Sequence, residues 1–167
     1  HRLIRRQRQM CIRDRFKDYK GTRKPMMEEL REQVPVIKEL LQKMNITTVE
    51  LPGYEADDVI GTLSKKGEKA GMEVDVISGD RDLLQLASDH ITICIPKTKK
   101  GQTTVEEYNT EGVMKLYKVT PTEFIDVKAL MGDSSDNIPG VPGIGEKGAT
   151  AIISQFGSIE NAYEHAD

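Results

Sequence analysis

Tryptophan is absent from this sequence of 167 residues, and aromatic residues of all kinds make up only 5% of it. Cysteine is nearly as scarce, and Cys11 and Cys94 have no CxxC spacing, which excludes a disulfide scaffold and favours a reduced, cytoplasmic protein. No apolar run approaches the roughly 20 residues of a membrane-spanning helix, so we expect no membrane partner. The basic stretch His1 to Arg15 is not followed by the apolar segment of a signal peptide either.

Charge is unevenly divided along the chain, although 24 Lys and Arg against 27 Asp and Glu leave a net charge of only −3. Ten of the basic residues but two of the acidic ones fall within residues 1–24. A basic arm leading into an acidic body predicts a polyanion as partner of the arm and a cation as partner of the body. A disordered, solvated tail is the alternative for the arm, and charge alone does not decide between them.

Hydrophobic periodicity predicts alternating helices and strands over the first two thirds of the chain. The expected helices are residues 28–44, 55–69 and 80–88, and the expected strands are residues 46–51, 74–78 and 91–95. Pro35 lies inside the first helix and should kink or divide it. A basic turn at residues 97–101 then leads into residues 102–105. This alternation predicts an α/β domain with a largely parallel sheet.

The last third of the sequence predicts helices on either side of a glycine-rich segment. Thr120 and Glu123 have the spacing of a capping box, with Pro121 in the first helical position of a helix that ends near Met131. Residues 132–148 are dense in Gly, Pro, Asp and Ser, and a final helix is expected over residues 149–156. The stretch therefore predicts a helical region distinct from the α/β part.

Three clusters of acidic residues lie at the predicted ends of strands and helices. They are Glu55, Asp57 and Asp58 after a Pro-Gly turn, Asp80 and Asp82 after a strand, and Asp133 and Asp136 in the glycine-rich segment. Each cluster has an ordinary explanation, because acids complement the first turn of a helix, cap it, or form Asx-turns. Metal binding is the alternative, since ligands bind beyond the carboxyl ends of strands in open α/β sheets.

Seven carboxylates are more than helix capping requires, and they would repel one another strongly if they converged without cations. Clusters of oxygen ligands without paired His or Cys favour Mg²⁺ or Mn²⁺ over zinc. Two such ions are the usual means of stabilising the attacking and leaving oxygens when a phosphodiester is cleaved. An acidic body is therefore compatible with an enzyme that acts on nucleic acid.

The segment Gly143 to Gly148 matches GxGxxG as a string. A dinucleotide-binding loop should follow a strand, whereas this segment follows a Pro-rich and Gly-rich turn. A helix-hairpin-helix suits the context better, because glycines allow close backbone approach and amides at the N-terminus of the next helix can contact phosphate. Such contacts hold a duplex without reading its bases, and a plain interhelical turn is the remaining alternative.

Together these motifs resemble the 5′-3′ exonuclease domains of bacterial DNA polymerases I, in the flap endonuclease superfamily. The resemblance rests on residues 53–61 (GYEADDVIG), 79–82 (GDRD) and 129–147 (ALMGDSSDNIPGVPGIGEK) and extends from about Phe16 to the end. It implies a PIN-like, mostly parallel sheet core with a C-terminal helix-hairpin-helix (H3TH) region. It also implies a structure-specific 5′-3′ exonuclease or flap endonuclease that removes flaps or RNA primers by a two-metal mechanism.

The resemblance also implies roles for individual residues. Glu55, Asp57 and Asp58 would mainly bind one Mg²⁺ or Mn²⁺ ion. Asp82, Asp133 and Asp136 would bind a second ion. Asp80 would lie near both ions, and Asp57 is a candidate to bridge them. Lys20 and Arg23, at the base of a helical arch, would act on the scissile phosphate beside Asp57 and Asp80 as the catalytic set. Tyr19, Lys20, Arg23, Gly143, Gly145 and Lys147 would contact DNA, with K⁺ a candidate at the hairpin.

The sequence departs from the family at its N-terminal end. The family's upstream strands, with two metal-ligand Asp residues, have no counterpart here, and residues 1–15 do not match. We therefore expect residues 1–15 to be a foreign or disordered basic tail, 16–118 a partial nuclease core with the arch base, and 119–167 the helix-hairpin-helix region. A catalytically impaired duplex-binding module is the alternative function, and a ribonuclease with the same core is a weaker one. Expected partners are 5′-flap or nicked DNA and a polymerase domain on the parent chain, with the protein a monomer.

Overall fold

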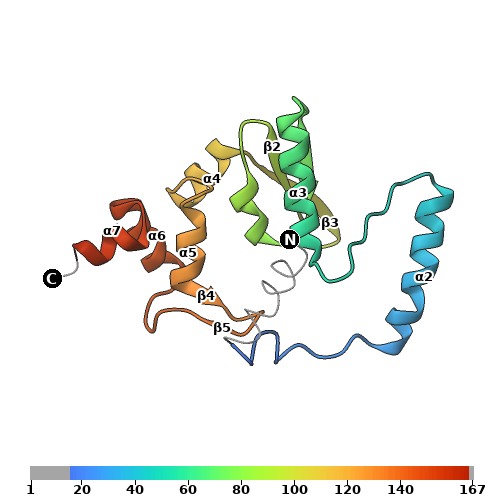
Figure 1. Cartoon of the computed structure of the whole chain (residues 1–167), viewed down its shortest axis with the longest axis horizontal. Coiled ribbons are helices and arrows are strands. Elements are labelled where there is room, and N and C mark those ends of the chain that lie inside the picture. The colour runs from blue at the N-terminus through green and yellow to red at the C-terminus, as the bar shows by residue number, and fades with distance from the viewer. Residues whose placement is uncertain (1–15, 166–167) are drawn as a thin grey trace, which may run out of the picture. The chain divides into compact units, whose positions relative to one another are not determined.

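The structure is a computed structural model that describes residues 16–165, so the predicted basic tail, residues 1–15, lies outside the described residues. The described chain forms two compact units (Figure 1). One unit comprises residues 16–59 together with Ser135–Asn137, and the other comprises Ile60–Ser134 together with residues 138–165. Each unit holds part of the predicted site, so the two are described separately.

The first unit is built around helix α2, Glu28–Lys43, which runs as one helix through Pro35. Pro35 therefore does not divide the helix, which leaves a kink as the part of the prediction still open: proline removes one N–H donor, but the strong helix formers around it continue the helix. The apolar stripe that predicted α2 has the expected spacing, yet none of its residues is buried.

The strand expected over residues 46–51 does not form, and this segment is irregular chain. A β-prone run becomes a strand only when a neighbouring strand pairs with its backbone, and within residues 16–59 and 135–137 no strand does so. Its apolar side chains Ile46, Val49 and Leu51 are correspondingly exposed. The next predicted helix is confirmed as α3, Ala56–Lys69, which begins in the first unit and continues into the second.

The second unit contains a three-stranded sheet in the order β1-β2-β3. Strands β1 (Val74–Ile77) and β2 (Ile91–Lys99) are parallel, with Val74 opposite Ile91, as the strand-helix-strand pattern predicts. The predicted helix between them is a short 3-10 helix, η1, Arg81–Leu86. The basic turn is a β-hairpin that places β3 (Gln102–Tyr108) antiparallel to β2, because Lys100 and Gly101 both have the positive φ of a tight hairpin turn.

Four helices complete the second unit: α4 (Thr110–Tyr117), α5 (Phe124–Met131), α6 (Glu146–Phe156) and α7 (Ile159–Glu164). Residues from the sheet, η1 and these helices share one hydrophobic core, whose fully buried side chains include Leu84, Ile91, Val113, Val127 and Ile153. No helix in residues 16–165 is long and apolar enough to cross a membrane. The two hydrogen bonds of the predicted capping box are present, because the Thr120 backbone N–H donates to Glu123 Oε2 at 2.7 Å and the Glu123 N–H donates to Thr120 Oγ1 at 3.2 Å. The predicted helical position of Pro121 is wrong, since residues 121–123 form a turn and α5 begins at Phe124.

Helices α5 and α6 pack side by side and are joined by the glycine-rich segment (Figure 1). The segment includes a small hairpin of β4 (Gly132–Asp133) and β5 (Ile138–Pro139). Its strands approach closely, since a Cβ at Gly140 would lie 2.3 Å from the Met131 carbonyl carbon. Helix α6 begins three residues earlier than predicted because Gly145, in extended conformation, is its N-cap. The predicted helix-hairpin-helix arrangement is therefore present.

Candidate functional site

A tight turn of residues 16–23 places cationic side chains in the first unit. The Gly21 N–H donates to the Asp18 carbonyl at 2.8 Å, and Lys20 has a φ of 57°. The tip of the β4–β5 hairpin holds this turn, because the Lys20 N–H donates to the Asp136 carbonyl at 2.9 Å and Asn137 Nδ2 donates to the Asp18 carbonyl at 2.8 Å. The two segments are more than 110 residues apart in sequence, so only the folded chain brings them together.

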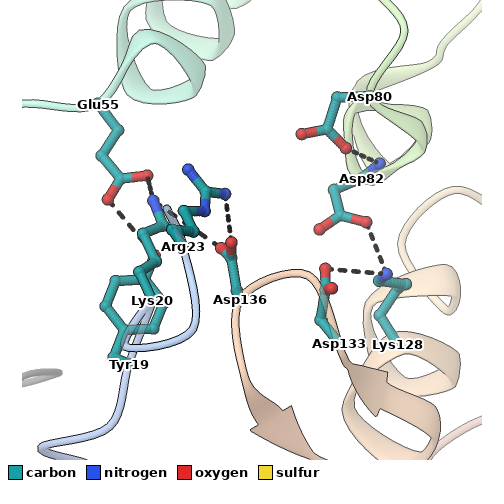
Figure 2. A network of polar contacts seen from close by, with 9 residues as sticks. All are labelled: Tyr19, Lys20, Arg23, Glu55, Asp80, Asp82, Lys128, Asp133 and Asp136. Carbon is teal, nitrogen blue, oxygen red and sulfur yellow. Dashed lines mark hydrogen bonds and ion pairs between the residues drawn. The ribbon is translucent and has the colours of Figure 1, made fainter. Parts of the chain in front are cut away.

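The turn residues pair with two predicted metal ligands, and we call Tyr19, Lys20, Arg23, Glu55 and Asp136 the turn cluster (Figure 2). Lys20 forms an ion pair with Glu55 and lies 3.8 Å from Asp136 Oδ2. Arg23 forms an ion pair with the other oxygen of Asp136. The Tyr19 hydroxyl donates to Glu55 Oε1 at 3.4 Å, and its ring lies 4.9 Å from the Lys20 ammonium. One lysine thus connects carboxylates of the first and third acidic clusters.

These contacts shift the acid-base properties of the turn cluster. The hydrogen bond from Lys20 lowers the pKa of Glu55, against the effect of partial burial. Burial alone would lower the pKa of Lys20, but its hydrogen bonds to Glu55 and Tyr19 raise it overall. Glu55 therefore stays an anion and Lys20 a cation across the physiological range.

The first turn of α3 partly follows the ordinary capping explanation. The Glu55 backbone N–H donates to Asp58 Oδ2 at 3.2 Å, which is the reciprocal half of a capping box. Asp57 lies in the same first turn. Glu55 thus uses its backbone at the cap while its carboxylate reaches Lys20.

In the second unit, Asp80 and Asp82 follow β1 as predicted, and Asp80 caps η1. Asp80 Oδ1 accepts a hydrogen bond from the Asp82 N–H at 2.9 Å, and the Asp80 N–H donates to Ser78 Oγ at 3.1 Å. Between them, Arg81 donates to the Tyr117 hydroxyl at 2.9 Å, and the Tyr117 ring packs on Phe124 at 4.7 Å. Arg81 thereby ties η1 to the helical core and sets the direction of its acidic neighbours.

Lys128 on α5 joins Asp82 to Asp133, and we call these three residues the Lys128 cluster (Figure 2). The Lys128 ammonium lies 2.8 Å from Asp82 Oδ1 and 3.4 Å from Asp133 Oδ2. Burial raises the pKa of Asp82 despite the hydrogen bond from Lys128. Burial would lower the pKa of Lys128, but its bonds to Asp82 and Asp133 raise it overall. The second acidic cluster is therefore connected to the third by a lysine as well.

The segment before α6 exposes backbone where the duplex contacts were predicted. A Cβ built at Gly143 or Gly145 would meet nothing within 4 Å, so both glycines border open space. Gly143 has a φ of +84°, which L side chains rarely adopt. Gly145 precedes the N-terminal amides of α6, and Lys147 is exposed in its first turn. This surface can accept an anion, because the N-terminal amides of a helix attract negative charge and the glycines before them leave open space.

Within each unit, two of the predicted metal ligands meet at one lysine: Glu55 and Asp136 in the first unit, and Asp82 and Asp133 in the second. Within residues 16–165, no three His, Cys, Asp or Glu side chains are placed to hold a metal ion together. Magnesium, however, is usually bound by one or two carboxylates with water and substrate phosphate completing its shell. The pair Asp82 with Asp133 fits that requirement, and Glu55 and Asp136, which are predicted to serve different ions, both contact Lys20.

Two residues important to this arrangement were missed from the sequence. Lys128 was not singled out, although a cation just before the Asp133 motif was a visible signal. Asn137 was read only as part of the third motif, and its amide fixes the turn at Asp18.

Known proteins match the whole described chain. Residues 6–118 match the family model for 5′-3′ exonuclease, N-terminal resolvase-like domain, and residues 119–167 match that for 5′-3′ exonuclease, C-terminal SAM fold. The chain is 54% identical to DNA polymerase I of Bacillus caldotenax and 55% identical to DNA polymerase I of Bacillus subtilis, over 152 residues. These alignments cover 91% of this chain and 17% of each relative.

Solved structures show the same fold. The bacteriophage T5 D15 protein, co-crystallised with metal ions, superposes with a TM-score of 0.72 at 29% identity, over 91% of this chain and 59% of that one. A complex of T5 D15 flap endonuclease with DNA and metal ions gives 0.71 at 28% identity, over 91% and 58%. The catalytic core of Rad2, in complex with DNA substrate, shares the fold at a TM-score of 0.56 and 22% identity, over 93% and 43%. With its α/β core, helical C-terminal region and acidic motifs, the chain belongs to the 5′-3′ exonuclease family.

Proposed function

We propose that this chain provides a 5′-3′ exonuclease or flap endonuclease activity that hydrolyses DNA phosphodiesters with divalent metal ions, as in flap or RNA-primer removal. The observation that carries the proposal is the pairing of acidic motifs, Glu55 with Asp136 and Asp82 with Asp133, each pair held by a lysine. Capping explains single acids, but it does not explain carboxylates from distant segments facing one cation. The T5 D15 flap endonuclease, crystallised with DNA and metal ions, supports it.

The proposed metal ligands are the seven carboxylates of the acidic motifs, with Mg²⁺ or Mn²⁺ as the ions. Glu55, Asp57 and Asp58 are assigned to one ion, Asp82, Asp133 and Asp136 to a second, and Asp80 to both. When bound, such ions stabilise charge on attacking and leaving oxygens and make water a better nucleophile. The donor set is all oxygen, which suits these hard ions and not zinc.

The turn cluster would handle the scissile phosphate. Lys20 carries a compact ammonium charge on a flexible side chain, and the planar guanidinium of Arg23 can donate hydrogen bonds to two phosphate oxygens. Both side chains extend from one tight turn. Tyr19 lies beside Lys20 and offers a ring face for a nucleotide base. When phosphate takes over the positive charges of Lys20 and Arg23, Glu55 and Asp136 lose these ion pairs, and their oxygens can turn to metal. We assign Lys20 and Arg23 to the catalytic set on this basis, and Asp57 and Asp80 to the same set because the resemblance of the acidic motifs implies it.

The α5–α6 hairpin would hold the duplex. Open backbone at Gly143 and Gly145 lets a phosphate approach the amides at the start of α6, and Lys147 adds charge. These contacts involve backbone phosphates, so binding should not depend on sequence. A K⁺ ion shared between hairpin carbonyls and phosphate would be compatible with this role. The proposed substrate is 5′-flap or nicked duplex DNA. The proposed partner is a polymerase domain on a longer parent chain. We propose that the protein is a monomer and lies in the cytoplasm.

The test is cleavage of a 5′-flap DNA by Asp80→Ala and Asp136→Ala variants beside Glu160→Ala, an acid of α7 far along the chain from the acidic motifs. We expect each site variant to lose at least about 100-fold in rate, the range seen when one group that stabilises transition-state charge is removed. Glu160→Ala should cleave like the unchanged chain. Undiminished cleavage by both site variants would reject the roles given to these carboxylates.

A duplex-binding module without cleavage is the second candidate, and the observation that favours it is the open backbone at Gly143 and Gly145 before the N-terminal amides of α6. Fluorescence anisotropy with flap DNA separates the two candidates. A binding module would retain nanomolar to micromolar affinity and show no metal-dependent product.

In both candidates Gly145→Ala should weaken binding about tenfold, because its methyl group occupies the open space beside the amides. Unchanged affinity in Gly145→Ala would remove the hairpin from the interface.

A further inference from the structure

The Lys128 cluster has a feature that the proposed nuclease function does not require. One ammonium group lies within 3.4 Å of carboxylate oxygens from two different elements, η1 and β4, while itself extending from a third, α5. These elements pack on one another within the second unit. The contact therefore joins three elements of the second unit, of which α5 packs against both η1 and β4.

These side chains are partly buried, which strengthens the electrostatic interaction between their charges. The side chain of Lys128 is 24% exposed, that of Asp133 20% and that of Asp82 40%. Two carboxylates that face one ammonium group in a partly desolvated place would repel each other without it, so a positive charge between them stabilises the fold. Lys128 supplies that charge in the structure as it stands.

We infer that Lys128 is a built-in counter-ion, and that a divalent cation binds the Asp82–Asp133 pair only by displacing the Lys128 ammonium. The inference rests on the proposed function, in which both carboxylates are metal ligands. A dication and an ammonium repel each other and compete for the same oxygens, so both cannot be satisfied at once. Lysine suits the exchange because its charge is compact and its four-carbon chain is flexible. Lys128 would keep the acidic site folded before metal arrives and would lower its affinity for metal.

Competition makes a prediction opposite to that of a positioning role. If Lys128 only competes, removing its charge strengthens metal binding, whereas if it aligns the carboxylates for metal, removing it weakens binding. The variants are Lys128→Met, which keeps the length without the charge, and Lys128→Arg, which keeps the charge. Lys115→Met, an exposed lysine of α4, matches the change in net charge at another place. Circular dichroism of each variant establishes that it folds.

The measurement is Mn²⁺ affinity of the full chain without DNA, followed by the electron paramagnetic resonance signal of free Mn²⁺. We expect Lys128→Met to bind Mn²⁺ about tenfold more tightly, within the usual range for coupling between two ligands, and Lys128→Arg and Lys115→Met to stay near the unchanged chain. In EDTA, Lys128→Met should melt at a lower temperature than the unchanged chain, and saturating Mn²⁺ should narrow that difference. Unchanged or weaker binding by folded Lys128→Met overturns the inference.

Asp133→Asn separates failure of this inference from failure of the proposed function. If Asp133→Asn loses Mn²⁺ affinity while Lys128→Met does not gain it, the carboxylates hold metal and only the counter-ion role is refuted. If Asp133→Asn and Asp82→Asn bind Mn²⁺ as well as the unchanged chain, the metal assignment itself fails, and the inference is overturned with it.

Discussion

Lysine residues bridge the carboxylates in both units, and this is the property of single side chains on which the function depends most. Lys20 contacts Glu55 and Asp136, and Lys128 contacts Asp82 and Asp133. Sequence reasoning identified all four acids because their local motifs are distinctive. It identified Lys20 from the resemblance but missed Lys128, because its role depends on the packing of η1, α5 and β4, which no local pattern encodes.

A second ion pair at residue scale gives a prediction for pH. His90 Nδ1 lies 2.7 Å from Glu73 Oε1, and this hydrogen bond, with the charge of Glu73, raises the pKa of His90. A raised pKa in the folded state stabilises the fold fully below the unfolded value of about 6.5, and the contribution disappears as pH rises through the folded value. NMR titration should show a higher His90 pKa in the unchanged chain than in Glu73→Gln. Equal titration in the two would contradict the pairing, and Glu160→Gln should leave it unaltered.

At the scale of elements, helices and caps that depend on neighbouring residues were predicted better than strands that depend on distant partners. The Thr120–Glu123 capping box is confirmed because both partners lie within four residues. The strand expected at residues 46–51 is wrong because β-propensity does not provide a partner strand. Helix α4 was missed, although Asn109 Oδ1 accepts a hydrogen bond from the Gly112 N–H at 2.9 Å, the N-cap contact its sequence could have signalled.

Two glycines of the helix-hairpin-helix should respond in opposite ways to alanine. Gly148 is exposed within α6, and a Cβ there would lie in ordinary contact, 3.6 Å from Ile144. Gly148→Ala should therefore raise the free energy of unfolding by about 0.5–1 kcal/mol, because alanine loses less backbone entropy in a helix. Chemical denaturation followed by circular dichroism measures the change, and a loss of stability would contradict the space seen beside Gly148.

Gly140→Ala is the counterpart and should destabilise the same region. Its Cβ would come within 2.3 Å of the Met131 carbonyl carbon, so backbone must move apart. We expect a loss of about 1–3 kcal/mol, the usual cost of forcing atoms into a packed region. The hairpin also carries Asp133, so Mn²⁺ affinity should fall together with stability. Normal stability in Gly140→Ala would show that the close approach of the two strands is not required.

At the scale of the whole molecule, charge and topology together suggest different proposed roles for the acidic body and for the helix-hairpin-helix. The acidic body holds its carboxylates at strand and helix ends, and the helix-hairpin-helix has open backbone before α6 and an exposed Lys147, which we propose as contacts for DNA. Sequence alone predicted both parts and the family, because the motif from Ala129 to Lys147 is long and specific. It could not predict that carboxylates would gather as lysine-held pairs, since that depends on contacts between distant segments.

The central claim is that this chain uses its acidic motifs for metal-dependent hydrolysis at a 5′ end. The most direct measurement compares a 5′-flap and a 3′-flap duplex, each labelled at the flap end, in Mg²⁺ and in EDTA. The account predicts a short labelled product from the 5′ flap alone, only in Mg²⁺, and almost none with Asp80→Ala. Cleavage that persists in EDTA, equal cleavage of both flaps, or no cleavage at any Mg²⁺ concentration would contradict it.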